Sequence, residues 1–336
     1  MARKKLNAAL QGGGAHGAFT WGVLDALLRS ERLSIHGVTG TSAGAMNAAV
    51  LVTGYMSGGE IAACEALEAF WRDVSQAARF SPFQRTPLDV LMGNWSLDSS
   101  PIYLAFDMAS RVISPAITNP LEINPLEPIV NKHVNFEAIR SCSDFKIFVA
   151  ATNVRTGKVR IFSHAELSTQ ALLASACIPQ MFAPIEIEGE AYWDGGFMGN
   201  PPLYPLFYET DTRDTLIVQI NPIVRDEVPT SAREIVNRVN EITFNSSLLK
   251  ELRAVRFVTR LIESGKLNPD EYMRVRLHRI ASTDLGPLSA SSKYNAEWDF
   301  LTYLRDVGRQ AAHNFMDTHF DSIGVRDTLN LDEELD

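Results

Sequence analysis

The stretch LNAALQGGGAHGAFTWGVLDALL, residues 6–28, decides the fold, because an apolar run, a glycine-rich loop and a helical pattern follow one another in it. The run from Leu6 to Leu10 is short and almost wholly apolar, as expected of a buried strand. From Gly17 to Arg29 the apolar residues recur every three or four positions, which is the spacing of a helix that buries one face. The stretch therefore predicts a strand, a loop and a helix in that order.

The loop carries Gly12, Gly14 and Gly17 at the spacing G-x-G-x-x-G. Glycines allow backbone N–H groups to approach an anion closely, and the N-terminus of the following helix adds positive potential. Such a loop suits the pyrophosphate of a dinucleotide, and it suits other negatively charged groups equally well. The loop alone does not decide between them.

Strand and helix patterns alternate through most of the remaining chain. We predict strands at 35–40, 145–153, 158–162, 215–220 and 272–280, and helices at 43–55, 60–74, 166–177, 233–263 and 296–318. This alternation is typical of a largely parallel sheet that helices cover on both faces. The sequence thus predicts an α/β fold.

Two segments differ from this pattern. Residues 80–133 hold seven of the sixteen prolines among scattered aromatic residues, which predicts an insertion of loops and short helices. The acidic end LDEELD, residues 331–336, is expected to be solvated and poorly ordered.

The composition is that of an ordinary globular protein with a substantial core, since 46% of the 336 residues are hydrophobic. A net charge of -9 argues against a general nucleic-acid-binding protein, because neutralising phosphates requires clustered basic residues. Cys64, Cys142 and Cys177 are odd in number and far apart, so we expect no disulfide framework and a reducing compartment. No apolar stretch reaches the roughly 20 residues of a membrane-spanning helix. We expect a cytoplasmic protein with at most peripheral contact with the inner membrane.

A second motif follows the predicted strand at 35–40. Gly40, Ser42 and Gly44 form G-x-S-x-G at a strand-to-helix turn, which is the context of a nucleophile elbow. The glycines stand where a side chain would collide with the tight turn. We interpret Ser42 as a nucleophile, against the alternative of an ordinary turn serine.

A serine nucleophile needs a base, and no histidine downstream of Ser42 lies in a recognisable catalytic loop. We expect structural or surface roles for these histidines, which are His133, His164, His278, His313 and His319. Asp194 stands out instead, because it opens the run DGGFMGNPP and precedes Gly195 and Gly196. An Asp-Gly pair is also a common turn dipeptide, so this alternative stays open here.

Taken together, QGGGAHG (11–17), GTSAG (40–44) and DGG (194–196) resemble the three motif blocks of the patatin-like phospholipases. The segment ASACIPQMFAP (174–184) is similar to the one that precedes the family's aspartate motif, and the likeness covers roughly residues 6–220. Residues 277–312 further resemble a C-terminal extension found in a bacterial subgroup.

The resemblance implies a three-layer α/β/α fold with a mostly parallel central sheet. We expect a catalytic domain over residues 1–222, with the insertion at about 80–133, and a mainly helical extension over 223–336 that packs on it.

The resemblance also implies a Ser-Asp dyad without histidine, with Ser42 as nucleophile and Asp194 as general base. The backbone of Gly12, Gly13 and Gly14 would then form the oxyanion hole. A dinucleotide-binding fold would instead place an acidic residue near the end of the second strand, where this chain has TGTSAG. We therefore interpret the opening loop as an oxyanion hole.

Two residues depart from the family pattern. His16 stands where an Arg or Lys is common, and Gln11 replaces an acidic residue often found before the glycines. A neutral histidine supplies less positive potential, so the role of His16 stays open between a catalytic one and shaping of the loop or contact with solvent. On the electrostatic interpretation, His16→Arg should hold or raise kcat.

Two further features suggest contact with lipid. The insertion either borders an acyl pocket or acts as a lid, or it packs as an ordinary long loop. Its aromatic residues are Phe80, Phe83, Trp95, Tyr103 and Phe106. Lys250, Arg253, Arg256 and Arg260 recur at helical spacing, as a basic stripe facing anionic headgroups or as a solvated, ion-paired helix face.

The sequence thus predicts a serine acyl hydrolase that cleaves fatty-acyl esters of phospholipids or related lipids. We expect no cofactor, and the sequence contains neither H-E-x-x-H nor a paired-cysteine metal motif. Two alternatives remain: a catalytically silent lipid- or protein-binding module of the same fold, and an acyltransferase that uses the same acyl-enzyme.

Overall fold

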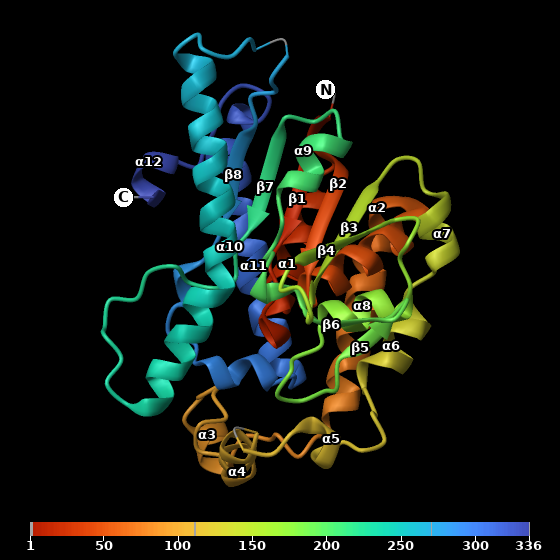
Figure 1. Ribbon diagram of the computed structural model, residues 1–336, viewed down its shortest axis with the longest axis vertical. Coiled ribbons are helices and arrows are strands. Elements are labelled where there is room, and N and C mark those ends of the chain that lie inside the picture. Colours follow the sequence, from red (N-terminus) through yellow and green to blue (C-terminus); the bar gives the residue numbers. More distant parts are fainter. Residues whose placement is uncertain (1–2, 111, 270, 336) are drawn as a thin grey trace.

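A computed structural model describes residues 3–110, 112–269 and 271–335 of the chain (Figure 1). Its sheet has a parallel centre, in the order β3-β2-β1-β7-β8, and an antiparallel edge. The central strands are β3 (Lys146–Asn153), β2 (Leu33–Thr41), β1 (Lys4–Leu10), β7 (Asp214–Val218) and β8 (Arg276–Ile280). At the edge, β4 (Val159–Ser163) and β6 (Glu190–Asp194) pair with β3, and β5 (Ile185–Ile187) pairs with β6.

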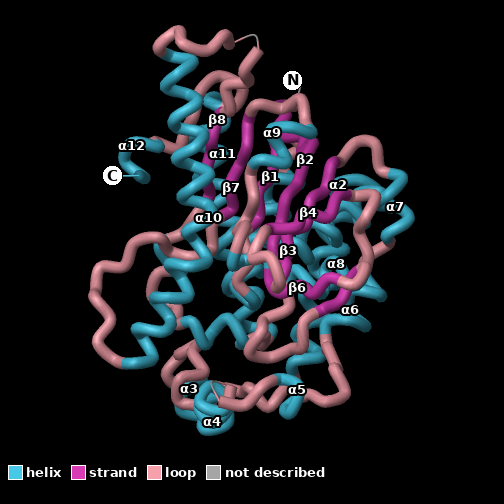
Figure 2. The backbone as a smooth tube through the Cα atoms, in the orientation of Figure 1, coloured by secondary structure: helices cyan, strands magenta, loops and turns pink. Residues whose placement is uncertain are grey.

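Helices cover both faces of this sheet (Figures 1 and 2). Strand β1 shows why, since Ala8 and Leu10 join one buried apolar cluster and Ala9, on the opposite side, joins the other. The first cluster draws on α1 (Gly17–Arg29), α2 (Ala43–Ala78), α6 (Leu126–His133), α7 (Phe136–Ser141), α8 (Thr169–Ser175) and α11 (Trp298–His319). The second draws on α9 (Tyr204–Glu209), α10 (Ala232–Glu263) and α12 (Leu331–Leu335). The expected three-layer α/β/α fold with a mostly parallel sheet is confirmed.

The insertion consists of loops and short helices, as predicted. Each of its helices α3 (Pro87–Leu91), α4 (Pro101–Ala109) and α5 (Pro115–Thr118) begins with proline, which suits the first helical position because no N–H is needed there. They lie beyond the end of the sheet toward which the parallel strands run (Figure 1). The insertion therefore lies near the carboxyl ends of the parallel strands, where the strand-to-loop motifs lie.

The predicted elements agree with the structure apart from their ends. The helix 17–29 has the predicted bounds, and the long helical pattern at 233–263 is α10. The two helices predicted at 43–55 and 60–74 are joined in α2, and Gly58 and Gly59 leave the helical conformation between them. This kink falls in the gap, residues 56–59, that the prediction left between the two helices.

The acidic tail corrects a prediction. Residues 331–335 form the helix α12, in which Leu331 is buried against α10, although Asp332 and Glu333 are exposed. Asp332 pairs with Arg256 and Arg260, and Glu334 pairs with Arg279. The sequence alone predicts a solvated run because the basic partners of these acidic residues lie far away in sequence.

These ion pairs also bear on the basic stripe. Arg256 and Arg260 face the tail, which supports the ion-paired alternative for that part of α10. In the described ranges, no helix has both the length and the apolar character needed to cross a membrane.

Candidate active site

Ser42 lies at the turn between β2 and α2. Its backbone has φ 53° and ψ -122°, a strained conformation for a residue other than glycine and one that marks nucleophile elbows. A Cβ atom at Gly40 would lie 2.5 Å from the Gly44 oxygen, and one at Gly44 would lie 2.2 Å from the Leu10 oxygen. Both motif glycines are therefore required by the tightness of the turn.

A residue that the sequence analysis missed supports this turn. The Ser42 N–H donates a 2.9 Å hydrogen bond to the hydroxyl of Ser175, at the end of α8. Ser175 is fully buried. The segment preceding the aspartate motif thus helps to position the nucleophile.

The glycine loop lies directly against Ser42. A Cβ atom at Gly12 would lie 2.7 Å from the Cβ of Ser42, so only glycine permits this approach. The Gly12 N–H donates a 2.7 Å hydrogen bond to Asn200 Oδ1 and is thereby occupied. Within the described part of the loop, the N–H groups of Gly13 and Gly14 have no protein acceptor. The loop therefore offers the N–H groups of Gly13 and Gly14, and not that of Gly12, to a ligand, while the oxyanion hole of Gly12, Gly13 and Gly14 stays a prediction.

Asp194 ends β6 and is 1% exposed. Its Oδ1 atom accepts a 2.7 Å hydrogen bond from the Gly196 N–H, and its backbone oxygen accepts one from the Thr152 hydroxyl. Burial raises the pKa of Asp194 to about 6, against the lowering effects of the Gly196 N–H, the Ser42 hydroxyl and Lys293. The hydroxyl is thus close enough to affect the carboxylate, and such contacts commonly tighten only when substrate binds.

The arrangement of Ser42 and Asp194 differs from a plain turn. An Asp-Gly turn residue would be solvated, whereas Asp194 is buried and interacts with the side chain of Ser42, whose backbone is strained. A carboxyl group whose pKa lies near neutrality can take up and return a proton at working pH. Gly195 and Gly196 form the 3-10 turn that follows and that supplies the hydrogen bond to the carboxylate.

His16 is 3% exposed, which excludes contact with solvent. Its Nε2 atom lies 2.7 Å from the Ser292 hydroxyl, which itself donates to the Ser289 oxygen, so we assign the ring proton to Nε2. Burial, together with Lys293 and Arg225, lowers the pKa of His16 to about 3. His16 is therefore a neutral, buried residue that fixes the loop to the C-terminal region.

Gln11 fits its surroundings as a neutral amide. Its oxygen accepts hydrogen bonds from the N–H groups of Ile220 and Asn221, and its nitrogen donates to the Asn200 oxygen and the Asn245 side chain. A carboxylate could not make the two donations. The departure from the family pattern at Gln11 thus follows from the polar groups around it.

The downstream histidines lie in other settings. His278 is fully buried on β8 and contacts Asp214, whose pKa is held well below its usual range although burial opposes the effect of His278 and Arg276. His133 pairs with Asp73 at 2.6 Å. Both contacts are structural ones. The three cysteines are free and buried, and burial raises the pKa of the Cys177 thiol to about 12.

The insertion residues divide into packed and exposed ones. Trp95 stacks on Phe300, and Phe83, Tyr103 and Phe106 form a cluster with Tyr294. Phe80, by contrast, is 92% exposed. Ordinary packing therefore accounts for most of these aromatic residues.

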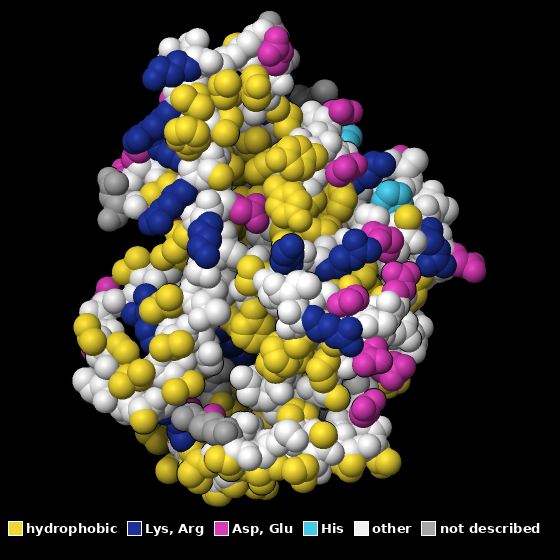
Figure 3. All heavy atoms as spheres, in the orientation of Figure 1, with side chains coloured by type: hydrophobic (Ala, Val, Ile, Leu, Met, Phe, Trp, Pro, Cys, Tyr) yellow, Lys and Arg dark blue, Asp and Glu magenta, His cyan; other side chains and the backbone are white. Residues whose placement is uncertain are grey.

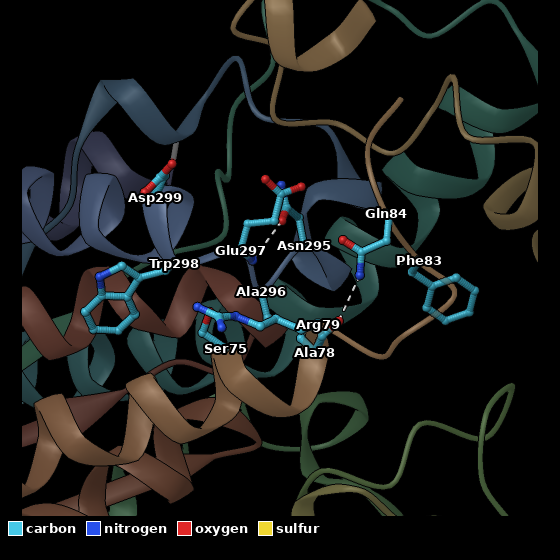
Figure 4. Close-up of a pocket in the computed structure, with 10 residues that line it drawn as sticks. All are labelled: Ser75, Ala78, Arg79, Phe83, Gln84, Asn295, Ala296, Glu297, Trp298 and Asp299. Carbon is cyan, nitrogen blue, oxygen red and sulfur yellow. Dashed lines mark hydrogen bonds between the residues drawn. The ribbon is translucent and has the colours of Figure 1, made fainter. Parts of the chain in front are cut away.

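A hollow of about 300 Å³ lies between the end of α2 and the start of α11 (Figure 4). Arg79, Gln84, Glu297 and Trp298 are among its lining residues, and neither Ser42 nor Asp194 lines it. It borders the base of the insertion and is separate from the candidate dyad.

Comparison with known proteins decides the family. The model of the patatin-like phospholipases matches residues 8–207, well over half of the chain and all three motif blocks. The chain belongs to this family. As a patatin-like phospholipase, it is a lipid acyl hydrolase, and a lipid is its expected substrate.

Solved structures resemble this patatin-like phospholipase at low identity. VipD from Legionella pneumophila is 17% identical, with a TM-score of 0.39, 91% of this chain and 67% of that one being covered. ExoU in complex with SpcU, from the type III secretion system of Pseudomonas aeruginosa, is 17% identical, with a TM-score of 0.34. This match covers 99% of the present chain and 65% of the matched chain. The chain thus spans about two thirds of their length. No curated protein matches the sequence.

Proposed function

We propose that the chain hydrolyses fatty-acyl esters of phospholipids or related lipids through a Ser42–Asp194 dyad. The observation that carries this proposal is the strained Ser42 beside a buried carboxyl group whose pKa is raised to about 6. Structural turns do not require either feature, whereas a nucleophile and its base require both.

In the acylation step, Asp194 accepts the proton of Ser42 while Oγ attacks the ester carbonyl carbon. The carbonyl oxygen becomes an oxyanion, which the N–H groups of Gly13 and Gly14 stabilise. Such a donor contributes about 3 to 4 kcal/mol to the stability of the transition state. When the intermediate collapses, the ester C–O bond breaks, and the proton passes from Asp194 to the departing alcohol oxygen.

Deacylation repeats these roles. Asp194 takes a proton from water, which attacks the acyl-serine. When the second tetrahedral intermediate collapses, the bond between the acyl carbon and Oγ breaks, the fatty acid leaves, and the proton passes from Asp194 to Oγ. A carboxylate is a weak base for a serine hydroxyl. The proposal therefore relies on the fixed positions of the elbow and loop and on the raised pKa of Asp194.

The test is fatty-acid release from a panel of diacyl and lyso phospholipids, neutral glycerides and a soluble ester. We expect wild-type activity on at least one lipid and a loss of at least about 10³-fold in Ser42→Ala. Ser175→Ala should lose less, since it only supports the turn. Activity that persists in a folded Ser42→Ala variant, or an inactive wild type that still binds lipid, would overturn the proposal.

We also propose that the insertion makes peripheral contact with a lipid surface. Its exposed apolar side chains gather at the lower end of the molecule (Figure 3), beside the catalytic edge of the sheet, and include Phe80, Leu88, Leu91, Met92, Met108, Val112, Ile117 and Leu121. Arg85, a basic residue near them, is paired with Glu297. Arg79, next to Phe80, is exposed and adds one positive charge to a mainly apolar surface, so the contact should be largely apolar.

Vesicle binding tests this contact. Replacing Leu91 and Met92 by Asp should weaken binding to phosphatidylcholine vesicles by at least about tenfold, because each buried apolar side chain contributes about 1.5–3 kcal/mol. Hydrolysis of a soluble ester should stay unchanged, and Val325→Asp, at an exposed site elsewhere, serves as the control. Equal vesicle binding by all three proteins would contradict a role for the insertion.

A further inference from the structure

Lys293 lies against the glycine loop although it is 280 residues away in sequence. A Cβ atom at Gly14 would lie 2.4 Å from the Lys293 backbone oxygen, and the preceding residue, Ser292, holds His16. The C-terminal region thus forms one wall of the loop. Lys293 is partly buried there, and its Nζ atom donates a 2.7 Å hydrogen bond to Asn221 Oδ1.

The Lys293 ammonium group differs from the other cations nearby. Arg225 and Arg238 both pair with Glu241, at 2.5 and 3.1 Å. No described carboxylate lies within ion-pair distance of Lys293 Nζ, although Glu241 and Asp194 are near enough to raise its pKa against the stronger lowering effect of burial. A partly buried ammonium group without an ion pair leaves its charge available to the loop.

Asn221 connects this charge with the loop backbone. While its Oδ1 atom accepts the hydrogen bond from Lys293, its Nδ2 atom donates a 2.7 Å hydrogen bond to the Gly12 oxygen. The Gly12 carbonyl and the Gly13 N–H belong to the same peptide group. A hydrogen bond to the carbonyl therefore polarises the N–H, and consecutive hydrogen bonds strengthen one another, most of all when the first donor is charged.

We propose that Lys293 and Asn221 form a relay that polarises the Gly12–Gly13 peptide and so strengthens the Gly13 N–H as an oxyanion donor. Both are positioning residues, since neither is placed in contact with the reacting atoms. The loop itself carries no cation, because His16 is neutral. Lys293, which is distant in sequence but lies against the loop in space, supplies the positive potential instead. This inference rests on the proposed function.

The test compares Lys293→Met with wild type on an uncharged soluble ester and on a phospholipid. Methionine keeps the apolar stem and removes a charge that has no ion pair, so the variant should fold. We expect kcat to fall about 10- to 100-fold on both substrates, with KM changed less than twofold, because the charge acts on the transition state. Lys293→Arg should retain most of the activity, and Lys266→Met, at an exposed position, is the matched control.

Three readouts separate the relay from a structural role. The acid limb of the kcat profile should move to higher pH in Lys293→Met, because Lys293 lowers the pKa of Asp194. Asn221→Leu should lower kcat, and the double variant should be little worse than Asn221→Leu alone, as expected for residues in series. Should the Met variant fail to fold, Lys293→Cys alkylated with 2-bromoethylamine restores an ammonium group, and kcat should return with it.

The outcomes also separate this inference from the proposed function. An unchanged kcat in Lys293→Met, beside an inactive Ser42→Ala, overturns the relay and leaves the dyad. A raised KM for the phospholipid alone overturns it as well, since Lys293 would then bind the headgroup phosphate. A Ser42→Ala variant that is as active as wild type would instead overturn the proposed function.

Discussion

At the scale of single residues, Asp194 is stabilised in its protonated form by the same burial that suits it to its proposed role. Its folded-state pKa, about 6, lies above the ordinary value near 3.8. Folding stability from this group is therefore greatest below pH 4 and is lost as the pH rises through 6. Catalysis needs the opposite, deprotonated state, so stability and activity respond to pH in opposite directions.

The pH dependence of kcat follows from this pKa. We expect kcat on a soluble ester to fall below about pH 6 as Asp194 becomes protonated. His278→Gln, His313→Gln and His319→Gln should each keep the wild-type profile wherever the variant folds. An acid limb that disappears in one of these histidine variants would show that a histidine is the base.

Asp194→Asn separates the role of Asp194 in catalysis from its effect on folding stability. The variant should lose at least about 10³-fold in kcat, as expected of a member of one catalytic unit, while Ser42→Ala/Asp194→Asn is little worse than either single variant. Its unfolding free energy at pH 8 should equal or exceed that of wild type, because a buried charge is removed. Urea denaturation at pH 8 measures this, and near-normal turnover in a folded Asp194→Asn protein would falsify the dyad.

His16→Arg tests the loop. The sequence favoured an unchanged or higher kcat, but the buried position beside Lys293 and Arg225 reverses this expectation. An unpaired buried cation costs on the order of 3 kcal/mol, so both kcat and the unfolding free energy should fall. His16→Asn, which is smaller and neutral, should keep more of both. An arginine variant that is as fast and as stable as wild type would restore the electrostatic interpretation.

The sequence identified the residues that stand in motifs and missed those that support them. The predictions of Ser42 and Asp194 rest on motif blocks that can be read in the sequence itself, GTSAG and DGG. Asn200, Asn221 and Lys293 contact the loop only after the chain has folded, and each lies roughly 190 to 280 residues away from it in sequence. No periodicity or turn signal marks such contacts, although Lys293 lies in a segment already known to resemble the family's extension.

At the scale of elements, α1 and α11 pack unusually closely. A Cβ atom at Gly22 would lie 1.9 Å from the Arg305 oxygen, and one at Gly308 would lie 2.1 Å from the Phe19 oxygen. The helix patterns predicted both elements, but an isolated glycine inside a helical pattern only lowers the strength of the prediction. Here the glycines are needed because two backbones meet.

Gly22→Ala should therefore destabilise the protein despite the higher helix propensity of alanine. Overpacking at such a contact costs about 1–3 kcal/mol of unfolding free energy. Urea denaturation provides the measurement, and Gln310→Ala, at an exposed position of α11, is the control. An alanine variant as stable as wild type would show that the two helices can separate without loss.

At the scale of the whole molecule, the C-terminal region is joined to the fold at several points. Strand β8 extends the sheet beside β7, α11 packs on α1, and Ser292 holds the glycine loop. We retain the division into a domain over 1–222 and an extension over 223–336 as a proposal. Composition and helical patterns suggested a mainly helical extension, and the long-range pairing of β8 could not be read from them.

The central claim is that Ser42 is a nucleophile activated by Asp194, and labelling with a fluorophosphonate tests it most directly. We expect wild-type protein to be labelled on the peptide that contains Ser42, as identified by mass spectrometry, with parallel loss of phospholipid hydrolysis. Ser42→Ala should not be labelled, and Asp194→Asn should be labelled at least about 100-fold more slowly. Labelling at another serine, or none in wild-type protein that hydrolyses lipid, would contradict the account.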